Sequence, residues 1–267
     1  MTNTSGVGFT EFAWDLPDGV RMPLLGFGTW QISGRRATDA VSVALQAGYR
    51  HIDTATMYGN ESQVGAAVRD SGLPREQIFI TTKLPPQRAG RERETLLDSL
   101  SALGTDYVDL WLIHWPPGRG AGVDSWRAFA RARENGQARA IGVSNYSLAQ
   151  IDELTRATGV TPSVNQVRWS PFQFDRRLLD ESRARGVELE GYSPFRAGRL
   201  DHPVLKGVAA RHGKTPAQII VRWHLQHAVA VIPKSARRER IVSNADVFDI
   251  ELNDHEMAAV DALSRAR

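Results

Sequence analysis

Short apolar segments alternate with longer amphipathic segments along most of the chain. The apolar segments are rich in β-branched residues, which is typical of buried β-strands. The amphipathic segments repeat with the period of an α-helix; in Thr38–Ala47, for example, Val41, Ala44 and Leu45 share one face, and Gly48 ends the pattern. This alternation predicts a parallel sheet in which most strands are followed by a covering helix.

Eight strand-like segments follow an N-terminal hairpin, which we expect at Phe9–Leu16 and Val20–Met22 around a Pro-Asp-Gly turn. The predicted strands are Leu24–Thr29, His51–Ala55, Ile78–Leu84, Tyr107–His114, Ala138–Ser144, Ser163–Trp169, Val187–Ser193 and Val229–Ser235. The predicted helices are Thr38–Ala47, Glu61–Ser71, Arg91–Leu103, Val123–Glu134, Ser147–Ala157, Asp175–Arg185, Pro203–His212, Pro216–His227, Arg238–Val247 and Asp254–Ala266. We therefore expect one α/β domain over residues 1–267, a (β/α)8 TIM barrel with an N-terminal β-hairpin and extra C-terminal helices.

An open, doubly wound sheet is the alternative architecture for alternating strands and helices. It predicts a glycine-rich turn after the first strand, and Gly26-Phe27-Gly28 is only a fragment of that motif because Gln31 stands where a third glycine is required. We therefore favour the closed barrel.

Composition and charge exclude several classes of function. The chain of 267 residues has no cysteine, which excludes disulfides, thiolate nucleophiles and cysteine-bound metals. Its net charge of +3 is spread over helix faces without a long basic segment, so we expect no nucleic-acid partner, although a local anion site is compatible with it. Neither a signal peptide nor a membrane-spanning apolar segment is found. We expect a cytoplasmic, monomeric protein.

Polar side chains stand at the predicted C-terminal ends of seven successive strands, where TIM barrels place their chemistry. They are Asp53, Lys83, His114, Ser144 and Asn145, Asn165 and Gln166, Tyr192 to Pro194, and Lys234 with Ser235. Taken singly, each has a plain structural explanation, such as a solvated loop lysine or a helix cap. Their convergence on one rim of the barrel favours a functional site.

Three of these side chains and a nearby loop residue form a chemical unit. Lys83 beside Asp53 makes a buried ion pair, and we expect its cation to lower the pKa of Tyr58 from about 10. Tyr58 can then donate a proton, and His114 can orient a carbonyl oxygen by a hydrogen bond. The unit suits protonation of an oxygen that gains negative charge, but it supplies no electrons.

The chain resembles the aldo-keto reductases, in particular their bacterial 2,5-diketo-gluconate reductase-like branch. The resemblance covers nearly the whole chain through motifs that include Gly-Phe-Gly-Thr-Trp, Tyr-Gly-Asn-Glu, Gly-Val-Ser-Asn and Tyr-Ser-Pro. It implies a catalytic tetrad of Asp53, Tyr58, Lys83 and His114. It also implies NADP(H) as the cofactor, a small aldehyde or ketone as the substrate, and no metal.

The resemblance further assigns a set of cofactor contacts. Ser144, Asn145 and Gln166 match the positions that hold the nicotinamide carboxamide, and Tyr192 matches the ring that stacks on it. Lys234, Ser235 and Arg240 match the residues that bind the 2′-phosphate, which suits a dianion physically. The remaining implied contacts are Asn244 for the adenine, and Thr29, Trp30, Ser193, Pro194 and Phe195.

Several positions depart from the pattern of the family. Ser243 replaces a common glutamate next to the adenine contact, Pro85 replaces a tryptophan of the substrate pocket, and Arg168 replaces a glutamate. The chain also ends at Arg267 without the long C-terminal loop of the family. We therefore expect an open substrate pocket with broad specificity, whose lining residues are Trp30, Tyr58, His114, Trp115 and Phe195.

Three other functions are compatible with parts of the pattern. Lys83 could form a Schiff base in a barrel lyase or aldolase. His51, Asp53 and His114 could be metal ligands of a hydrolase, but His51 begins its strand, at the end away from the rim. A nucleotide-sensing subunit without catalysis is the third alternative, and an intact tetrad argues against it.

Overall fold

Eight parallel strands form one sheet in which neighbouring strands are also consecutive in the chain. The structure is a computed structural model and describes residues 12–17, 19–195 and 199–265. The strands are β3 Phe27–Gly28, β4 His51–Asp53, β5 Phe79–Leu84, β6 Val108–Ile113, β7 Ala138–Ser144, β8 Val164–Arg168, β9 Glu188–Tyr192 and β10 Ala230–Val231.

The first and last strands meet and close the sheet into a barrel. Leu25 pairs with Val231 in parallel, and Gly28 N donates to Pro233 O over 3.1 Å. A Cβ at Gly28 would lie 2.9 Å from Ile232 O, so only glycine allows the two backbones to approach this closely. The predicted (β/α)8 barrel is thereby confirmed, and the open doubly wound sheet is wrong.

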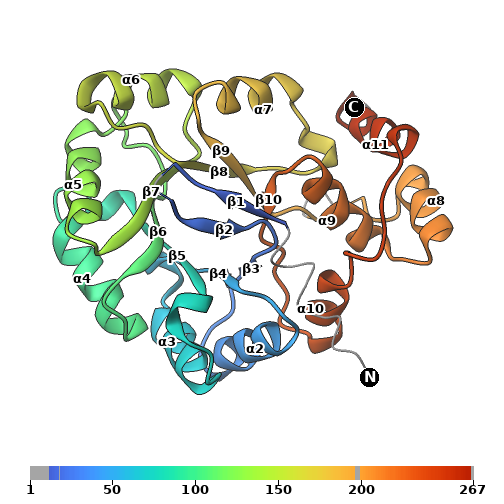
Figure 1. Cartoon of the computed structure of the whole chain (residues 1–267), viewed down its shortest axis with the longest axis horizontal. Helices are drawn as coiled ribbons and strands as arrows, with labels where there is room; N and C mark the ends of the chain where they lie inside the picture. The colour runs from blue at the N-terminus through green and yellow to red at the C-terminus, as the bar shows by residue number, and fades with distance from the viewer. Residues whose placement is uncertain (1–11, 18, 196–198, 266–267) are drawn as a thin grey trace.

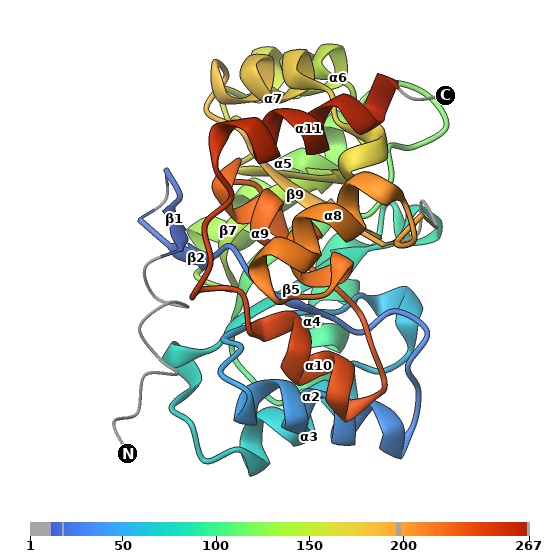
Figure 2. The same ribbon diagram turned by 90° about the vertical axis from the view of Figure 1, so that its right-hand side faces the viewer.

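Helices surround the barrel, and the turned view shows α8 to α11 together on one side of it (Figures 1 and 2). The stacked rings of Trp111 on β6 and Phe129 on α5, with centroids 3.6 Å apart, illustrate how the outer strand faces pack against them. No helix in the described ranges is both long and apolar enough to span a membrane. The helices are α2 Arg35–Gln46, α3 Glu61–Asp70, α4 Glu92–Leu103, α5 Val123–Glu134, α6 Leu148–Thr158, α7 Arg176–Arg183, α8 Pro203–His212, α9 Pro216–Gln226, α10 Arg238–Ala245 and α11 Asp254–Asp261.

The first and last strands are shorter than the sequence pattern predicts. Only Phe27–Gly28 and Ala230–Val231 have strand geometry, although the predictions were Leu24–Thr29 and Val229–Ser235. Pro233 contributes to the shortening because it has no N–H to donate to a neighbouring strand. Lys234 and Ser235 therefore lie in the loop that follows β10.

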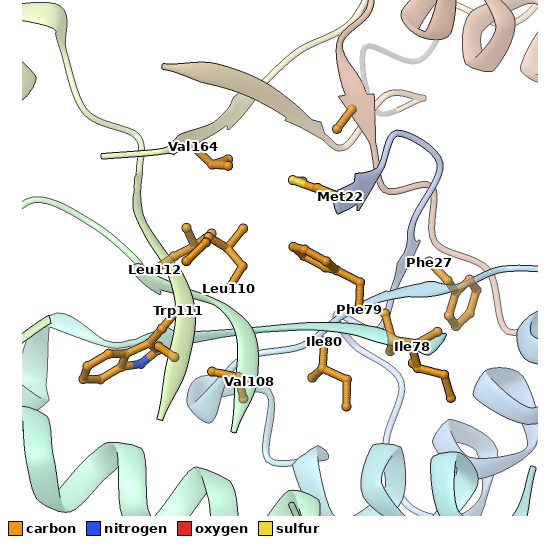
Figure 3. Packing of buried hydrophobic residues seen from close by; sticks show 14 of the residues in the cluster. Met22, Phe27, Ile78, Phe79, Ile80, Val108, Leu110, Trp111, Leu112 and Val164 are labelled. Carbon is orange, nitrogen blue, oxygen red and sulfur yellow. The ribbon is translucent and has the colours of Figure 1, made fainter. Parts of the chain in front are cut away.

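The N-terminal hairpin closes the end of the barrel at which the strands begin. It consists of β1 Ala13–Asp15 and β2 Arg21–Pro23; Phe9 and Asp18, which we assigned to it, lie outside the described residues. The side chain of Met22 is buried inside the barrel near Phe79 (Figure 3). With this end covered, the carboxyl ends of the strands remain as the place for a site.

Candidate active site

A buried ion pair between β4 and β5 lies at the centre of the site. Lys83 Nζ donates to Asp53 Oδ1 over 2.7 Å and to Asp53 Oδ2 over 2.6 Å. It also donates to the carbonyl oxygen of Thr54 over 2.8 Å, so all three ammonium hydrogens are directed to oxygen atoms. The period of two along each strand directs Asp53 and Lys83 into the barrel.

Lys83 retains its charge although its side chain has no exposed surface. Burial by itself lowers the pKa of an ammonium, but Asp53 together with Tyr58 and Glu190 more than compensates, and the net pKa of Lys83 is raised. Lys83 is thus a permanent cation at neutral pH. Schiff-base formation requires a neutral amine, so the geometry disfavours the lyase alternative.

Tyr58 is presented by a short 3₁₀ turn, Thr56–Tyr58, in the loop after β4. Gly59 ends this turn at φ +64°, a conformation that favours glycine. The buried amide of Asn60 then donates to Thr29 O over 3.0 Å and to Ile32 O over 2.8 Å. The Tyr-Gly-Asn motif therefore fastens the loop that carries Tyr58 to the loop that follows β3.

The phenol of Tyr58 lies against the Lys83 cation. The Lys83 Nζ to Tyr58 Oη distance is 3.4 Å, and the ammonium lies 5.0 Å from the ring centroid. We expected the cation to lower the pKa of Tyr58, but burial dominates and the net pKa is raised, with Lys83 opposing the rise. At neutral pH the phenol therefore holds its proton. Lys83 is placed to stabilise the phenolate that remains once the proton is donated.

His114 follows the end of β6 and faces Tyr58. The two rings meet edge to face, with centroids 5.8 Å apart. Burial, followed by the repulsion of the Lys83 cation, lowers the pKa of His114 to about 3, so its imidazole is neutral at physiological pH. Its buried Nδ1 has no hydrogen-bond partner among the described residues. A neutral imidazole beside the phenol can orient a polar group by a single hydrogen bond.

The ends of β7 and β9 are connected by hydrogen bonds. Asn145, in the left-handed conformation at φ 63°, donates from Nδ2 to Ser144 Oγ over 2.9 Å. The Tyr192 hydroxyl donates to Asn145 Oδ1 over 2.8 Å, and Ser144 Oγ donates to Gln166 O over 2.9 Å. Three of the residues assigned to a carboxamide site and the ring assigned to stacking thus lie in one connected group.

Glu190 on β9 is a buried residue of the site that we did not predict. Gln166 Nε2 donates to both Asp53 Oδ2 and Glu190 Oε2, each over 2.8 Å. Glu190 thereby joins the network around Lys83. A signal was available in the sequence: Glu190 stands two residues before Tyr192, so in a strand both point into the barrel.

The other residues assigned to the cofactor occupy the same rim. Thr29 is fully buried, and its hydroxyl donates to Asp53 O over 2.9 Å, so it supports the strand that carries Asp53. Ser193 has a positive φ of 55°, which turns the chain after Tyr192. Pro194 is buried, and Phe195 is partly buried against both hydrophobic core clusters.

Two cations stand near the beginning of α10 without a counter-ion. Lys234 and Arg240 are exposed, and neither forms an ion pair or side-chain hydrogen bond within the described ranges. Ser235, between them in sequence, is nearly buried and its Oγ accepts from Arg237 N over 3.1 Å. Asn244 is a buried residue of α10. The predicted 2′-phosphate residues thus offer two uncompensated charges.

Large apolar side chains are exposed in the loops at this end of the barrel. Trp30, Met57 and Trp115 are 37%, 55% and 46% exposed and follow β3, β4 and β6 respectively. Each lies in or beside the loop that carries a residue of the site, so they give the rim an apolar character.

The ligands proposed for the metal alternative do not gather. His51 begins β4, and its ring nitrogens face Pro23 O and Thr81 Oγ1 at the hairpin end of the strand. Across the described part of the chain, no group of three or more His, Asp or Glu side chains is arranged to hold a metal ion. His51 is instead part of the network that surrounds Glu190.

Comparisons with known protein families and sequences agree with one another. The sequence profile of the Aldo/keto reductase family matches residues 24–265. A glyoxal reductase from Bacillus subtilis (strain 168) is 42% identical, with 94% of this chain and 92% of the relative covered.

Two solved structures share the fold closely. An aldo/keto reductase from Brucella melitensis is 44% identical at a TM-score of 0.91, with 94% of this chain and 97% of that chain covered. An aldo-keto reductase from Bombyx mori in complex with NADP is 33% identical at a TM-score of 0.89, with 94% and 92% covered. With the family profile matching nearly the whole barrel, the chain belongs to the aldo/keto reductase family.

Proposed function

We propose that the protein is an NADPH-dependent reductase of small aldehydes and ketones, with Tyr58 as the general acid. The observation that carries this proposal is the buried Lys83–Asp53 pair, whose ammonium lies 3.4 Å from the Tyr58 hydroxyl. A protonated phenol beside a permanent cation suits the donation of a proton to an oxygen that becomes an alkoxide.

Each residue of the tetrad then has its own role. His114, neutral, donates a hydrogen bond to the carbonyl oxygen and holds it near the Tyr58 hydroxyl. Tyr58 transfers its proton to that oxygen, and Lys83 stabilises the phenolate that is left. Asp53 keeps Lys83 charged and fixed in place through two hydrogen bonds. When bound, NADPH supplies the hydride that reduces the carbonyl carbon.

The residues around the tetrad fit a phosphorylated dinucleotide. Asn145, Gln166 and Tyr192 offer amide groups and an aromatic ring beside the tetrad, and the relative from Bombyx mori binds NADP. Lys234 and Arg240 have no counter-ion within the described ranges, as expected of side chains that meet a phosphate. These residues would hold the dinucleotide.

We expect the protein to accept small substrates and to discriminate only weakly among them. The exposed rings of Trp30 and Trp115 offer apolar contact without enclosing the ligand. The similarity to a glyoxal reductase supports small dicarbonyls as one substrate class. We expect glyoxal and short aldehydes to be reduced with high KM values.

A turnover assay tests the function directly. Purified protein, NADPH and glyoxal or a short aldehyde should give loss of the nicotinamide absorbance with formation of the alcohol. A parallel sample receives the carbonyl compound and borohydride without cofactor, which traps any Schiff base on Lys83. Absence of NADPH consumption together with labelling of Lys83 would reject the reductase in favour of the lyase.

A cofactor titration tests the proposed phosphate contacts. Arg240→Gln and Lys234→Gln should each weaken NADPH binding by about 10- to 100-fold, as expected for the loss of a charge-assisted hydrogen bond. NADH binding should change little because NADH lacks the 2′-phosphate. Quenching of tryptophan fluorescence measures both affinities.

Arg238→Gln is the matched control for this titration. Arg238 lies on the same helix two residues from Arg240, on a different face, and donates to Gln46 Oε1 over 3.4 Å. It should leave NADPH affinity unchanged. Equal affinities of the wild-type protein for NADPH and NADH would show that the phosphate contacts are wrongly assigned.

A further inference from the structure

Glu190 is a buried acid that the proposed chemistry does not use. Its side chain has no exposed surface, and its Oε2 accepts the hydrogen bond from Gln166 Nε2. Its other oxygen, Oε1, has no hydrogen-bond partner within the described part of the chain. A buried ionised carboxylate with an unpaired oxygen is strongly unfavourable, so burial favours the protonated, neutral form of Glu190.

The neighbour of Oε1 is a histidine nitrogen that cannot donate. His51 Nε2 lies 3.5 Å from Glu190 Oε1, and His51 Nδ1 lies 3.1 Å from Pro23 O. A carbonyl oxygen only accepts, so Nδ1 carries the hydrogen. Burial lowers the pKa of His51 to about 4, so the ring is neutral and Nε2 presents a lone pair. That lone pair already accepts from the Thr81 hydroxyl over 3.0 Å. His51 therefore has no hydrogen to donate to an ionised Oε1, which a proton on Oε1 would leave uncharged.

The surrounding charges also favour a neutral Glu190. The titratable groups around it are His51 and Asp53 of β4, Lys83 of β5 and the phenol of Tyr58. Lys83 is the cation of this group, and both Asp53 oxygens already accept from it. One positive charge cannot compensate two carboxylates. Burial, followed by the Asp53 charge, raises the pKa of Glu190 to about 8.

The amide of Gln166 is oriented by the two acids. Both hydrogens of its Nε2 are donated, one to Asp53 Oδ2 and one to Glu190 Oε2. A flipped amide would place its oxygen against these two acceptors. Gln166 Oε1 is therefore directed away from them, and it receives no hydrogen bond from the described residues. An acceptor in this place complements the NH2 group of a carboxamide.

We propose that Glu190 is a positioning residue that carries a proton on Oε1 at neutral pH and, with Asp53, fixes the Gln166 amide for a carboxamide. The consequence for nicotinamide binding rests on the proposed function, whereas the protonation of Glu190 does not. Glu190 thereby stands beneath the tetrad without touching the reacting atoms.

Infrared spectroscopy of the protein without cofactor tests the proton. At neutral pH the wild-type spectrum should contain the carbonyl band of a buried protonated carboxylic acid, and Glu190→Gln should lack it. Glu188→Gln is the matched control, because Glu188 is also an acid of β9 whose pKa is raised by burial, two residues away on the same face. It should retain the Glu190 band. Loss of only a carboxylate band in Glu190→Gln would overturn the proposal, whatever the protein catalyses.

The pH dependence of stability gives a second readout. The pKa of Glu190 is raised in the folded protein from 4.5 to about 8, so the folded state holds a proton that the unfolded chain releases. The free energy of unfolding is therefore unaffected by this difference below about pH 4.5, and it falls as the pH rises toward 8. The urea midpoint of Glu190→Gln should fall less over this interval than that of the wild type. An unchanged slope would contradict a protonated Glu190.

Two variants separate positioning from mere space filling. Glu190→Gln retains an acceptor for Gln166, so its NADPH affinity should remain within about twofold of the wild type. Glu190→Leu retains most of the volume but no acceptor, and should bind NADPH about tenfold more weakly. Equal affinities in the two variants would overturn the positioning role. If the leucine variant fails to fold, a tenfold loss of NADPH affinity in Glu190→Gln would overturn the positioning role.

Discussion

Replacement of Tyr58 by phenylalanine is expected to lower kcat by about 10³-fold, the typical contribution of a general acid. The variant loses only the hydroxyl. Its ring can retain the edge-to-face contact with His114, and the lost Lys83 contact of 3.4 Å is a long one. Folding and cofactor affinity should therefore change little. Initial rates and a fluorescence titration on the same preparation measure both quantities.

Tyr107→Phe is the control for this result. Tyr107 precedes β6 at the opposite end of the barrel, where its ring lies 4.2 Å from the guanidinium of Arg75. Removal of its hydroxyl should leave kcat within about twofold of the wild type. A Tyr58→Phe protein that keeps a tenth or more of the activity would remove Tyr58 from the role of proton donor.

Replacement of Lys83 by methionine should impair both catalysis and folding. Without the ammonium, nothing stabilises the phenolate of Tyr58, and kcat should fall by at least about 10³-fold. The Asp53 carboxylate would also remain buried without its cation, which typically costs about 3–5 kcal/mol of the free energy of unfolding. Urea unfolding and initial rates test the two effects separately.

The double replacement Asp53→Asn with Lys83→Met separates charge from structure. It removes both buried charges, so most of the lost stability should return, while kcat should remain as low as in the single variant. A double variant as unstable as Lys83→Met would show that the ion pair contributes through its shape and hydrogen bonds. A Lys83→Met protein with normal activity would contradict the role of the cation.

The fold could be predicted because each strand carries its own pattern. Val108–Ile113 is apolar except for Asp109, and its Trp111 meets the amphipathic α5 through Phe129 as the alternation requires. The ends of the barrel were harder to predict. The strand at Phe27–Gly28 is closed by backbone contacts with residues near Ile232, and such distant pairing leaves no local periodicity.

The site could be predicted only in part. The position of a residue in its strand follows from the local sequence, whereas its pKa depends on residues that are distant in the sequence. The placement of Asp53, Lys83 and His114 at strand ends follows from the barrel. The pKa of Tyr58 is raised because its burial in the folded protein outweighs the effect of the Lys83 cation. Glu190 was missed for a related reason, because its significance comes from Gln166 and His51, which are far from it in sequence.

Transfer of deuterium from NADPH in which both hydrogens at C4 of the nicotinamide are replaced by deuterium is the most direct test of the central claim. The protein is incubated with this cofactor and glyoxal or a short aldehyde, and the product is analysed by mass spectrometry and NMR. We predict an alcohol with one deuterium on the former carbonyl carbon, formed at a rate that Tyr58→Phe lowers by about 10³-fold. A product without deuterium, or equal rates for the two proteins, would contradict the account.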